Sequence, residues 1–174
     1  LGCLYGEGAA KMAHDLGCTK DEAQDLINTF FEANPKIHLS IKAMHQFAEE
    51  NELTHTMLGR IRRLYRINSS NGGLASAERR QAYNTLIQGS GSEMMKLAML
   101  QIDNSKEFKE LGGVLILTVH DELIAKAPKE TSKDVSRLMK SMMADPYNWG
   151  PIKHTYPVPV DPDGSTGHRW SEIH

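Results

Sequence analysis

The stretch GGVLILTVHDELIAKAPKE, residues 112–130, decides the fold of this chain. Residues 114–119 are apolar enough to form a buried strand, and a second apolar run, residues 123–127, follows almost at once. Two short apolar runs this close together are typical of an antiparallel strand pair. At the bend between the runs stand His120, Asp121 and Glu122.

The ionisable bend is a candidate site. A carboxylate at the tip of a strand pair is held in a fixed place, and hard divalent cations prefer oxygen ligands. Asp121 is therefore a candidate metal ligand, whereas Glu122 is expected to point to a different side. Aspartate is also a favoured turn residue, so an ordinary polar turn accounts for the same three letters.

Most of the remaining chain carries a helical pattern. Apolar residues recur at helical spacing in four segments, near residues 20–34, 37–48, 75–105 and 131–143. Thr19 and Glu22 form a capping-box pattern before the first segment, and Pro35 ends it. In the third segment Gly89 and Gly91 weaken the helix and leave room for another backbone or a ligand.

Two further segments complete the pattern. Residues 55–73, HTMLGRIRRLYRINSSNGG, predict a β-hairpin or an extended segment, followed by a loop. The last 30 residues are rich in proline, glycine and aspartate, and one strand is expected near residues 155–160. The sum is an α+β fold, mostly helical with a small antiparallel sheet.

The overall composition excludes several classes of protein. With 174 residues, 40% apolar and 24% charged, the chain reads as a globular domain or part of a larger one. No apolar run approaches the roughly 20 residues that span a membrane, so no membrane partner is expected. The two cysteines form no metal-ligand spacing and no disulfide framework, which favours an intracellular setting.

The net charge is only −2, but positive charge is concentrated locally. Between positions 60 and 80 a single acid, Glu78, stands against six arginines: Arg60, Arg62, Arg63, Arg66, Arg79 and Arg80. Such a stripe is expected of a surface that contacts phosphate. A solvated charged face would look the same in the sequence.

Two other stretches carry residues suited to nucleic acid. In ERRQAYNTLIQGSGSEMMKLAM, residues 78–99, Arg80, Asn84 and Gln88 are spaced by four and share a helix face. The amides could bind minor-groove acceptors that every base pair presents, and the arginine a phosphate. The alternative interpretation is that this helix face is polar only because it is exposed to solvent. In the opening LGCLYGEGAA, Tyr5 beside Gly6 forms a possible stacking platform for a base.

Together these stretches resemble the C-terminal part of the polymerase domain of family A DNA polymerases. LGCLYGEGA resembles the end of motif B, N-F-G-x-x-Y-G, and TVHDEL resembles motif C. GRIRRLYRINSSNGG resembles G-R-R-x-Y-L-P-D-I-x-S-x-N, and ERRQAYNTLIQGSGSEMMKLAM resembles E-R-x-A-x-N-x-x-x-Q-G-x-A-A-D-x-x-K-x-A-M. GHRWSEIH resembles the family's G-x-x-W ending. The motifs occur in the family's order and cover essentially the whole chain.

The resemblance implies a role for each candidate residue. Asp121 would be one of two aspartates that hold the catalytic Mg²⁺ ions, with Glu122 an auxiliary acid and His120 at the primer terminus. The residues implied to contact primer-template DNA are Arg80, Asn84, Gln88, Tyr5, Gly6, Arg60 and Arg63. Tyr5 and Leu1 would also lie at the incoming dNTP, and Leu1 stands where the family most often has Phe or Tyr. The assigned subdomains are the end of the fingers, residues 1–50, and part of the palm, residues 51–174.

The resemblance also implies what must come from elsewhere. Motif A, with the second metal aspartate, precedes these motifs in the family and is not in this sequence. One carboxylate cannot organise two ions, so polymerisation by this chain alone is not expected. We expect an N-terminal polymerase polypeptide as partner, as in a split enzyme that a phage could encode, and a cytoplasmic location in a bacterial or phage-infected cell. The alternative is a non-catalytic DNA-binding module that keeps the polymerase fold.

Overall fold

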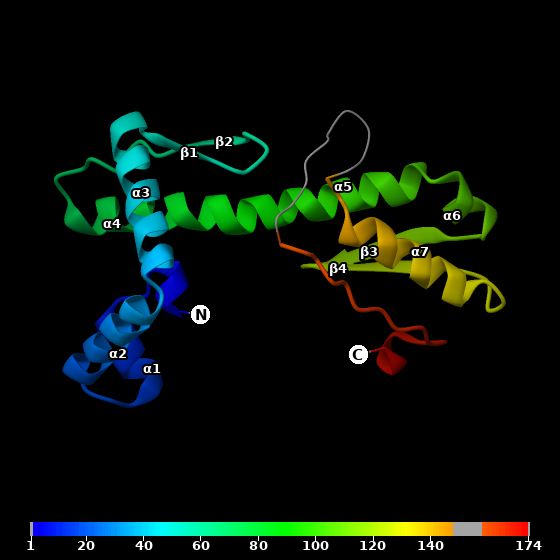
Figure 1. Cartoon of the computed structure of the whole chain (residues 1–174), viewed down its shortest axis with the longest axis horizontal. Helices are drawn as coiled ribbons and strands as arrows, with labels where there is room; N and C mark the ends of the chain where they lie inside the picture. The colour runs from blue at the N-terminus through cyan, green and yellow to red at the C-terminus, as the bar shows by residue number, and fades with distance from the viewer. Residues whose placement is uncertain (1, 148–157, 174) are drawn as a thin grey trace. The chain divides into compact units, whose positions relative to one another are not determined.

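The computed structural model describes residues 2–147 and 158–173, and the chain divides into two compact units, Leu1–Ser90 and Gly91–His174 (Figure 1). The boundary between the units falls within a run of helical residues. Because the units are defined by internal contacts, they do not test the assignment of residues 1–50 and 51–174 to two polymerase subdomains.

The first unit is mostly helical and contains one small sheet. Its elements are η1 (Gly2–Tyr5), α1 (Ala9–Leu16), α2 (Lys20–Ala33), α3 (Pro35–Asn51), β1 (Leu53–His55), β2 (Ile61–Arg63), α4 (Gly72–Asn84) and the π-helical turn η2 (Thr85–Gly89). Strands β1 and β2 pair antiparallel and form the predicted hairpin. Helices α2, α3 and α4 lie where the sequence predicted helices, so these predictions are confirmed.

The start of α2 shows why these residues form a helix there. The Thr19 hydroxyl accepts a hydrogen bond from the Glu22 backbone N–H at 3.3 Å, and the Glu22 carboxylate accepts one from the Thr19 backbone N–H at 2.8 Å. This capping box satisfies two backbone donors that a helix end leaves without partners. Helix α2 ends at Ala33, and Pro35 occupies the first turn of α3, where proline is favoured.

The core of the first unit joins α3, the turn after β2, and α4. Four buried side chains form this cluster: Ala48, Leu64, Ile67 and Ala82. A second cluster between α1 and α2 consists of Ala9, Met12, Ala13 and Ala23. Thr54 of β1 is fully buried and donates its hydroxyl to the Ala82 carbonyl oxygen at 3.2 Å. The β1–β2 hairpin is thereby fixed against α4.

The predicted helix near residues 75–105 is helical but not uniform. It consists of α4, the π-helical turn η2, and α5 (Ser90–Asn104). A Cβ atom at Gly89 would lie 2.9 Å from Thr56 Cγ2. A close approach therefore occurs at Gly89, but the neighbour is the Thr56 side chain and not the backbone or ligand expected, and a Cβ at Gly91 would meet open space.

The second unit contains the strand pair predicted from residues 112–130. Its elements after α5 are α6 (Lys106–Glu110), β3 (Val114–Val119), β4 (Glu122–Lys126), α7 (Ser132–Ala144) and η3 (Trp170–Glu172). The buried core residues are Ile102, Phe108, Val135 and Met139, from α5, α6 and α7. Part of the strand expected near residues 155–160 lies outside the described residues, and residues 158–160 are not in a strand.

A β-bulge divides the register of β3. Leu115 pairs with Ala125 and Leu117 pairs with Ile124, so Ile116 is one extra residue with no partner. Leu115 and Ala125 pack against the core of the second unit. On the opposite face the side chains of Val114, Ile116 and Leu117 are 57%, 58% and 50% exposed.

The expectation that both strands are buried is therefore wrong for one face. Within residues 2–147 and 158–173, helices cover only the face that carries Leu115 and Ala125. We call Val114, Ile116 and Leu117 the apolar sheet face. With its two small antiparallel sheets among helices, the fold is α+β as predicted. Among the described residues, no helix combines the length and hydrophobicity needed to cross a membrane.

Candidate functional site

The tip of the β3–β4 hairpin presents two ionisable side chains. Val119 pairs with Glu122, which leaves His120 and Asp121 as a two-residue turn. Both side chains are exposed to solvent. The strand pair therefore displays a carboxylate and an imidazole from a backbone that the ladder on either side fixes in place.

The backbone of His120 adopts an uncommon conformation. Its φ is 52°, in the left-handed region, which few residues other than glycine occupy. The sharp two-residue turn requires a positive φ at its first position. Holding histidine there costs roughly 1–3 kcal/mol, so the sequence retains a strained side chain beside Asp121 where glycine would be less strained.

The geometry at Asp121 fits one ligand of a metal site and not a complete site. Its carboxylate is exposed and lies at a fixed turn, which suits the oxygen-ligand preference of Mg²⁺. Among the described residues, no group of three or more His, Cys, Asp or Glu side chains could hold a metal ion. Any ion at Asp121 would need further ligands from outside this part of the chain.

The predicted DNA-contacting row lies on α4 and η2. Arg80 and Gln88 are exposed, and Asn84 is half-buried between them. Gln88 lies in the π-helical turn, so its direction differs from that of an uninterrupted α-helix. Turns of this kind occur frequently at functional sites. The side-chain oxygen of Asn84 is buried and has no hydrogen-bond partner in the described part of the chain.

The structure brings the opening stretch to this row. Gly6 has a φ of 73°, and a Cβ atom on it would lie 2.9 Å from Arg80 Cγ. Gly6 therefore permits both the turn and the close approach. Arg80 also donates to the Ser76 hydroxyl at 2.9 Å. Tyr5, at the end of η1, precedes this contact and is half-buried.

The arginines of the basic stretch do not all point the same way: some face solvent, and one bonds to α4. Arg60 and Arg63 of the β1–β2 hairpin are exposed, as a DNA-contacting role requires. Arg62, a member of the basic stripe to which no individual role was assigned, donates to Gln81 Oε1 on α4 at 2.8 Å. The alternation of a strand places Arg62 on the opposite face from Arg63, and this signal was present in the sequence. Leu1 lies outside the described residues.

The predicted site residues thus fall into two groups. Those expected to contact DNA or the nucleotide lie in the first unit, with Gly6 and Arg80 in contact. Those expected at the metal and the primer end lie together at the hairpin tip of the second unit.

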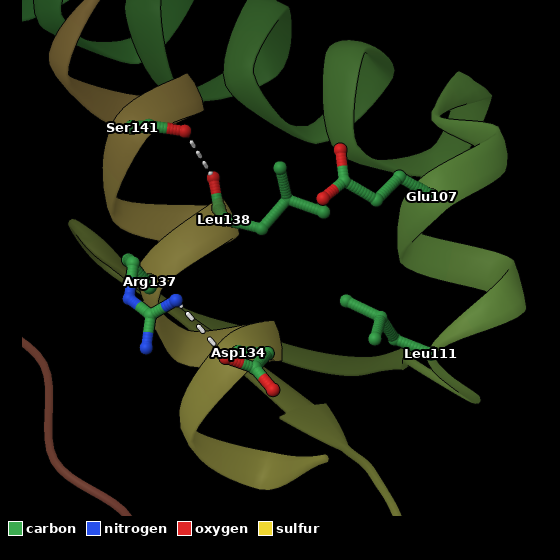
Figure 2. A pocket seen from close by; sticks show the side chains of 6 residues that line it. All are labelled: Glu107, Leu111, Asp134, Arg137, Leu138 and Ser141. Atoms are coloured by element: carbon green, nitrogen blue, oxygen red, sulfur yellow. Dashed lines mark hydrogen bonds and ion pairs between the residues drawn. The ribbon is translucent and has the colours of Figure 1, made fainter.

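A pocket of about 300 Å³ lies on the second unit, and none of the predicted residues lines it. Figure 2 shows side chains of α6 and α7 around it. Asp134 is paired with Arg137 at 3.0 Å, and the Ser141 hydroxyl donates to the Leu138 carbonyl oxygen at 2.8 Å. Because most of its polar groups already have partners, the pocket points to no particular ligand.

Comparison with known proteins agrees with the motifs. DNA polymerase I of Borreliella burgdorferi is 35% identical over the whole chain, and the thermostable DNA polymerase I of Thermus aquaticus is 31% identical over 98% of it. The chain spans only 18% and 19% of the length of these two relatives.

A solved structure shows the same fold. The POL domain of Pol1 from M. smegmatis, in complex with DNA primer-template and dNTP, matches 92% of this chain with a TM-score of 0.82 and 28% identity. The chain covers 27% of that protein. The family model "DNA polymerase family A" matches residues 1–172, so this chain belongs to DNA polymerase family A.

Proposed function

We propose that this chain is the C-terminal part of the polymerase domain of a DNA-directed DNA polymerase. It would help to add deoxynucleotides to a primer 3′ end. Family membership over residues 1–172 is the observation that carries the proposal. A relative of the same fold was solved with primer-template DNA and dNTP, which supports the same substrates here. Within the domain we assign residues 1–50 to the fingers and 51–174 to the palm.

The reaction would be attack of the primer 3′ hydroxyl on the α-phosphate of a deoxynucleoside triphosphate. This attack would form the new phosphodiester bond, break the bond between the α- and β-phosphates, and release pyrophosphate and the hydroxyl proton. Mg²⁺ ions held by Asp121 and a second aspartate would stabilise charge on the attacking and leaving oxygens. Asp121 supplies a fixed carboxylate, and Glu122 an additional negative charge beside it. His120 would position the primer end, since it shares the turn with Asp121.

The first unit would hold the nucleic acid. Arg80 would contact a phosphate, while Asn84 and Gln88 would reach minor-groove acceptors common to all base pairs. Tyr5 would pack beside the templating base, and Leu1 beside the incoming sugar. The contact of Gly6 with Arg80 supports a continuous surface from the opening stretch to α4.

The preceding part of the polymerase domain would complete the site, as a separate or a continuous polypeptide. Two observations support this requirement. Asp121 belongs to no group of three or more potential metal ligands in the described part of the chain. The apolar sheet face is left exposed on the strand pair that presents Asp121, and exposed apolar area of this kind marks an interface.

Primer extension tests the proposal directly. The chain is assayed together with the preceding part of the domain, with Mg²⁺, a primed template and dNTPs. Asp121→Asn should reduce extension to background and leave primer-template binding intact. The matched control is Asp103→Asn, an exposed aspartate on α5, which should leave extension unchanged.

Two outcomes would contradict parts of the proposal. Full extension by the Asp121→Asn protein would remove Asp121 from the metal site. DNA binding without any extension, even by the unaltered protein, would favour the non-catalytic DNA-binding module.

A further inference from the structure

Tyr65 is the feature of the first unit that the proposed function does not use. Its side chain is 80% exposed, more than any other large apolar or aromatic side chain of the described residues. A tyrosine ring carries a large apolar surface, which normally packs against something. A single exposed ring needs no explanation by itself, so its surroundings decide its meaning.

Tyr65 lies in the turn that follows β2, two residues after the strand ends at Arg63. The pairing of β2 with β1 continues one residue further, because the Leu64 N–H donates to the Glu52 carbonyl oxygen at 2.8 Å. Arg62 and Leu64 turn toward the protein: Leu64 is 1% exposed, and Arg62 bonds to Gln81 of α4.

The intervening side chains turn outward as a row. Ile61 is 59% exposed, Tyr65 is 80% exposed, and Arg63 between them is also exposed. We call Ile61, Arg63 and Tyr65 the outward row. Ile61 and Arg63 alternate with Arg62 as the period of a strand requires, and Tyr65 follows in the turn after the strand. The β1–β2 hairpin lies beside α4 (Figure 1).

The backbone under Tyr65 is fixed on both sides. Leu64 before it and Ile67 after it are core residues. The buried Glu78 carboxylate accepts from the Arg66 backbone N–H at 2.7 Å and from Arg66 Nε at 3.2 Å. The ring is therefore presented from a rigid turn, so little backbone freedom would be lost when a partner packs on it.

The segment that carries the ring, positions 60–80, is mostly positive, although the exposed acid Glu52 lies across the hairpin from Leu64. Arg63 pairs with no acid among the described residues. The only acid between positions 60 and 80 is Glu78, which lies under the turn and is engaged by Arg66. An exposed aromatic ring within a positive stretch is the combination that binds single-stranded nucleic acid, through base stacking and phosphate contact.

We propose that the outward row is a subsite for single-stranded DNA, in which a base stacks on Tyr65 and a phosphate contacts Arg63. The inference rests on the proposed function, and it adds that the unpaired part of the DNA substrate binds on the β1–β2 hairpin. This subsite is separate from the Arg80, Asn84 and Gln88 row proposed for the duplex.

Fluorescence anisotropy with a labelled oligothymidylate tests the subsite. The protein is the chain with the preceding part of the polymerase domain, without dNTP. Tyr65→Leu should weaken binding roughly 5- to 150-fold, the range for loss of one stacked base, and Tyr65→Phe should bind within about twofold of the unaltered protein, because stacking needs only a ring. Arg63→Gln should lower the magnitude of the salt slope by about 0.7.

Matched controls separate the subsite from general surface effects. Leu39→Ala removes a side chain that is 65% exposed on α3, and Arg137→Gln removes an exposed arginine of the second unit. Neither should change the affinity. An oligonucleotide with a photoreactive 5-iododeoxyuridine should form its adduct at Tyr65.

Three outcomes would overturn the inference: unchanged affinity of Tyr65→Leu, an equal loss with Tyr65→Phe, or burial of Tyr65 under the preceding part of the domain, seen as protection from labelling without DNA. If Tyr65→Leu binds normally while extension proceeds, the subsite fails and the proposed function stands. If binding depends on Tyr65 but no extension occurs, the subsite stands and the proposed function fails.

Discussion

At the scale of single residues, His120 shows strain next to a candidate reactive group. His120→Gly should relieve the left-handed φ of 52°, and the gain should roughly offset the extra chain entropy of glycine. The thermal unfolding midpoint should therefore stay close to that of the unaltered protein. Primer extension should fall, because the side chain expected at the primer end is lost.

His120→Ala separates the effect of the strained backbone from the effect of the imidazole side chain. It removes the imidazole and keeps the strain, so it should lose extension without relief of the strained backbone. If His120→Gly extends primers normally, the positioning role of the imidazole is wrong.

His45 makes a prediction about acid stability. Burial, and secondarily the nearby Arg79 guanidinium, hold the pKa of His45 below its ordinary value of 6.5. The unfolded chain then takes up the proton first as the pH falls. Stability should be fully present above pH 6.5 and decline as the pH falls from there toward the folded-state pKa.

Thermal unfolding midpoints between pH 8 and pH 5 check this sign. His45→Gln should flatten the decline, because it removes the group whose pKa is lowered. A midpoint that rises on acidification would contradict the assignment.

The residue types in the motifs were sufficient to predict which side chains could bind a metal or DNA. They were not sufficient to predict how deeply each side chain is buried or what it contacts. The sequence predicts Asp121 at a strand bend, and the structure confirms that position. It does not predict the buried, partnerless oxygen of Asn84, because burial depends on contacts between segments far apart in the chain. The exposure of Tyr65 was not predictable from alternation in β2, because Tyr65 lies in the turn after the strand.

At the scale of elements, a buried acid ties the β1–β2 hairpin to α4. Glu78→Gln should lower the free energy of unfolding by roughly 1–3 kcal/mol, since it weakens charge-assisted hydrogen bonds to Arg66 at a buried acceptor. Arg66→Gln in the same background should cost less than it does alone, because the two side chains form one interaction. Chemical denaturation of the single and double variants measures this.

Glu107→Gln is the matched control, since Glu107 is an exposed acid on α6. Its effect should stay within about 0.5 kcal/mol. Additive effects of the Glu78 and Arg66 changes would show that the two groups act independently.

Most of the longer elements were predictable from local patterns, but the short helices α1 and α6 and two irregularities were not. Capping residues and apolar periodicity correctly predict α2, α3, α7 and both hairpins. The π-helical turn at Thr85–Gly89 and the bulge at Ile116 each insert one residue beyond the regular repeat. Their positions depend on packing rather than on composition, as Gly89 against Thr56 illustrates.

At the scale of the whole molecule, the apolar sheet face is expected to be covered by the preceding part of the polymerase domain. Leu117→Gln should barely change the stability of this chain by itself, because the side chain is 50% exposed. It should weaken association with that preceding part roughly 10- to 150-fold, as expected for the loss of one buried leucine. Chemical denaturation of this chain checks the stability, and titration of one polypeptide with the other checks the affinity.

Leu16→Gln, at a leucine of α1 that is 61% exposed, provides the comparison. Equal weakening by both variants would show that the apolar sheet face has no special role. The exposure of this face was not predictable from residues 114–119, since a strand that is apolar on both faces does not reveal what covers each one.

The bulge in β3 has a consequence for how the length of this hairpin can vary. Pairing on both sides of Ile116 places Leu115 and Thr118 on one face although they are three positions apart. Deletion of Ile116 would leave a regular strand in which every remaining side chain keeps its face and its partner. The hairpin thus contains one dispensable position, and a chain one residue shorter there would still carry Asp121 at its tip.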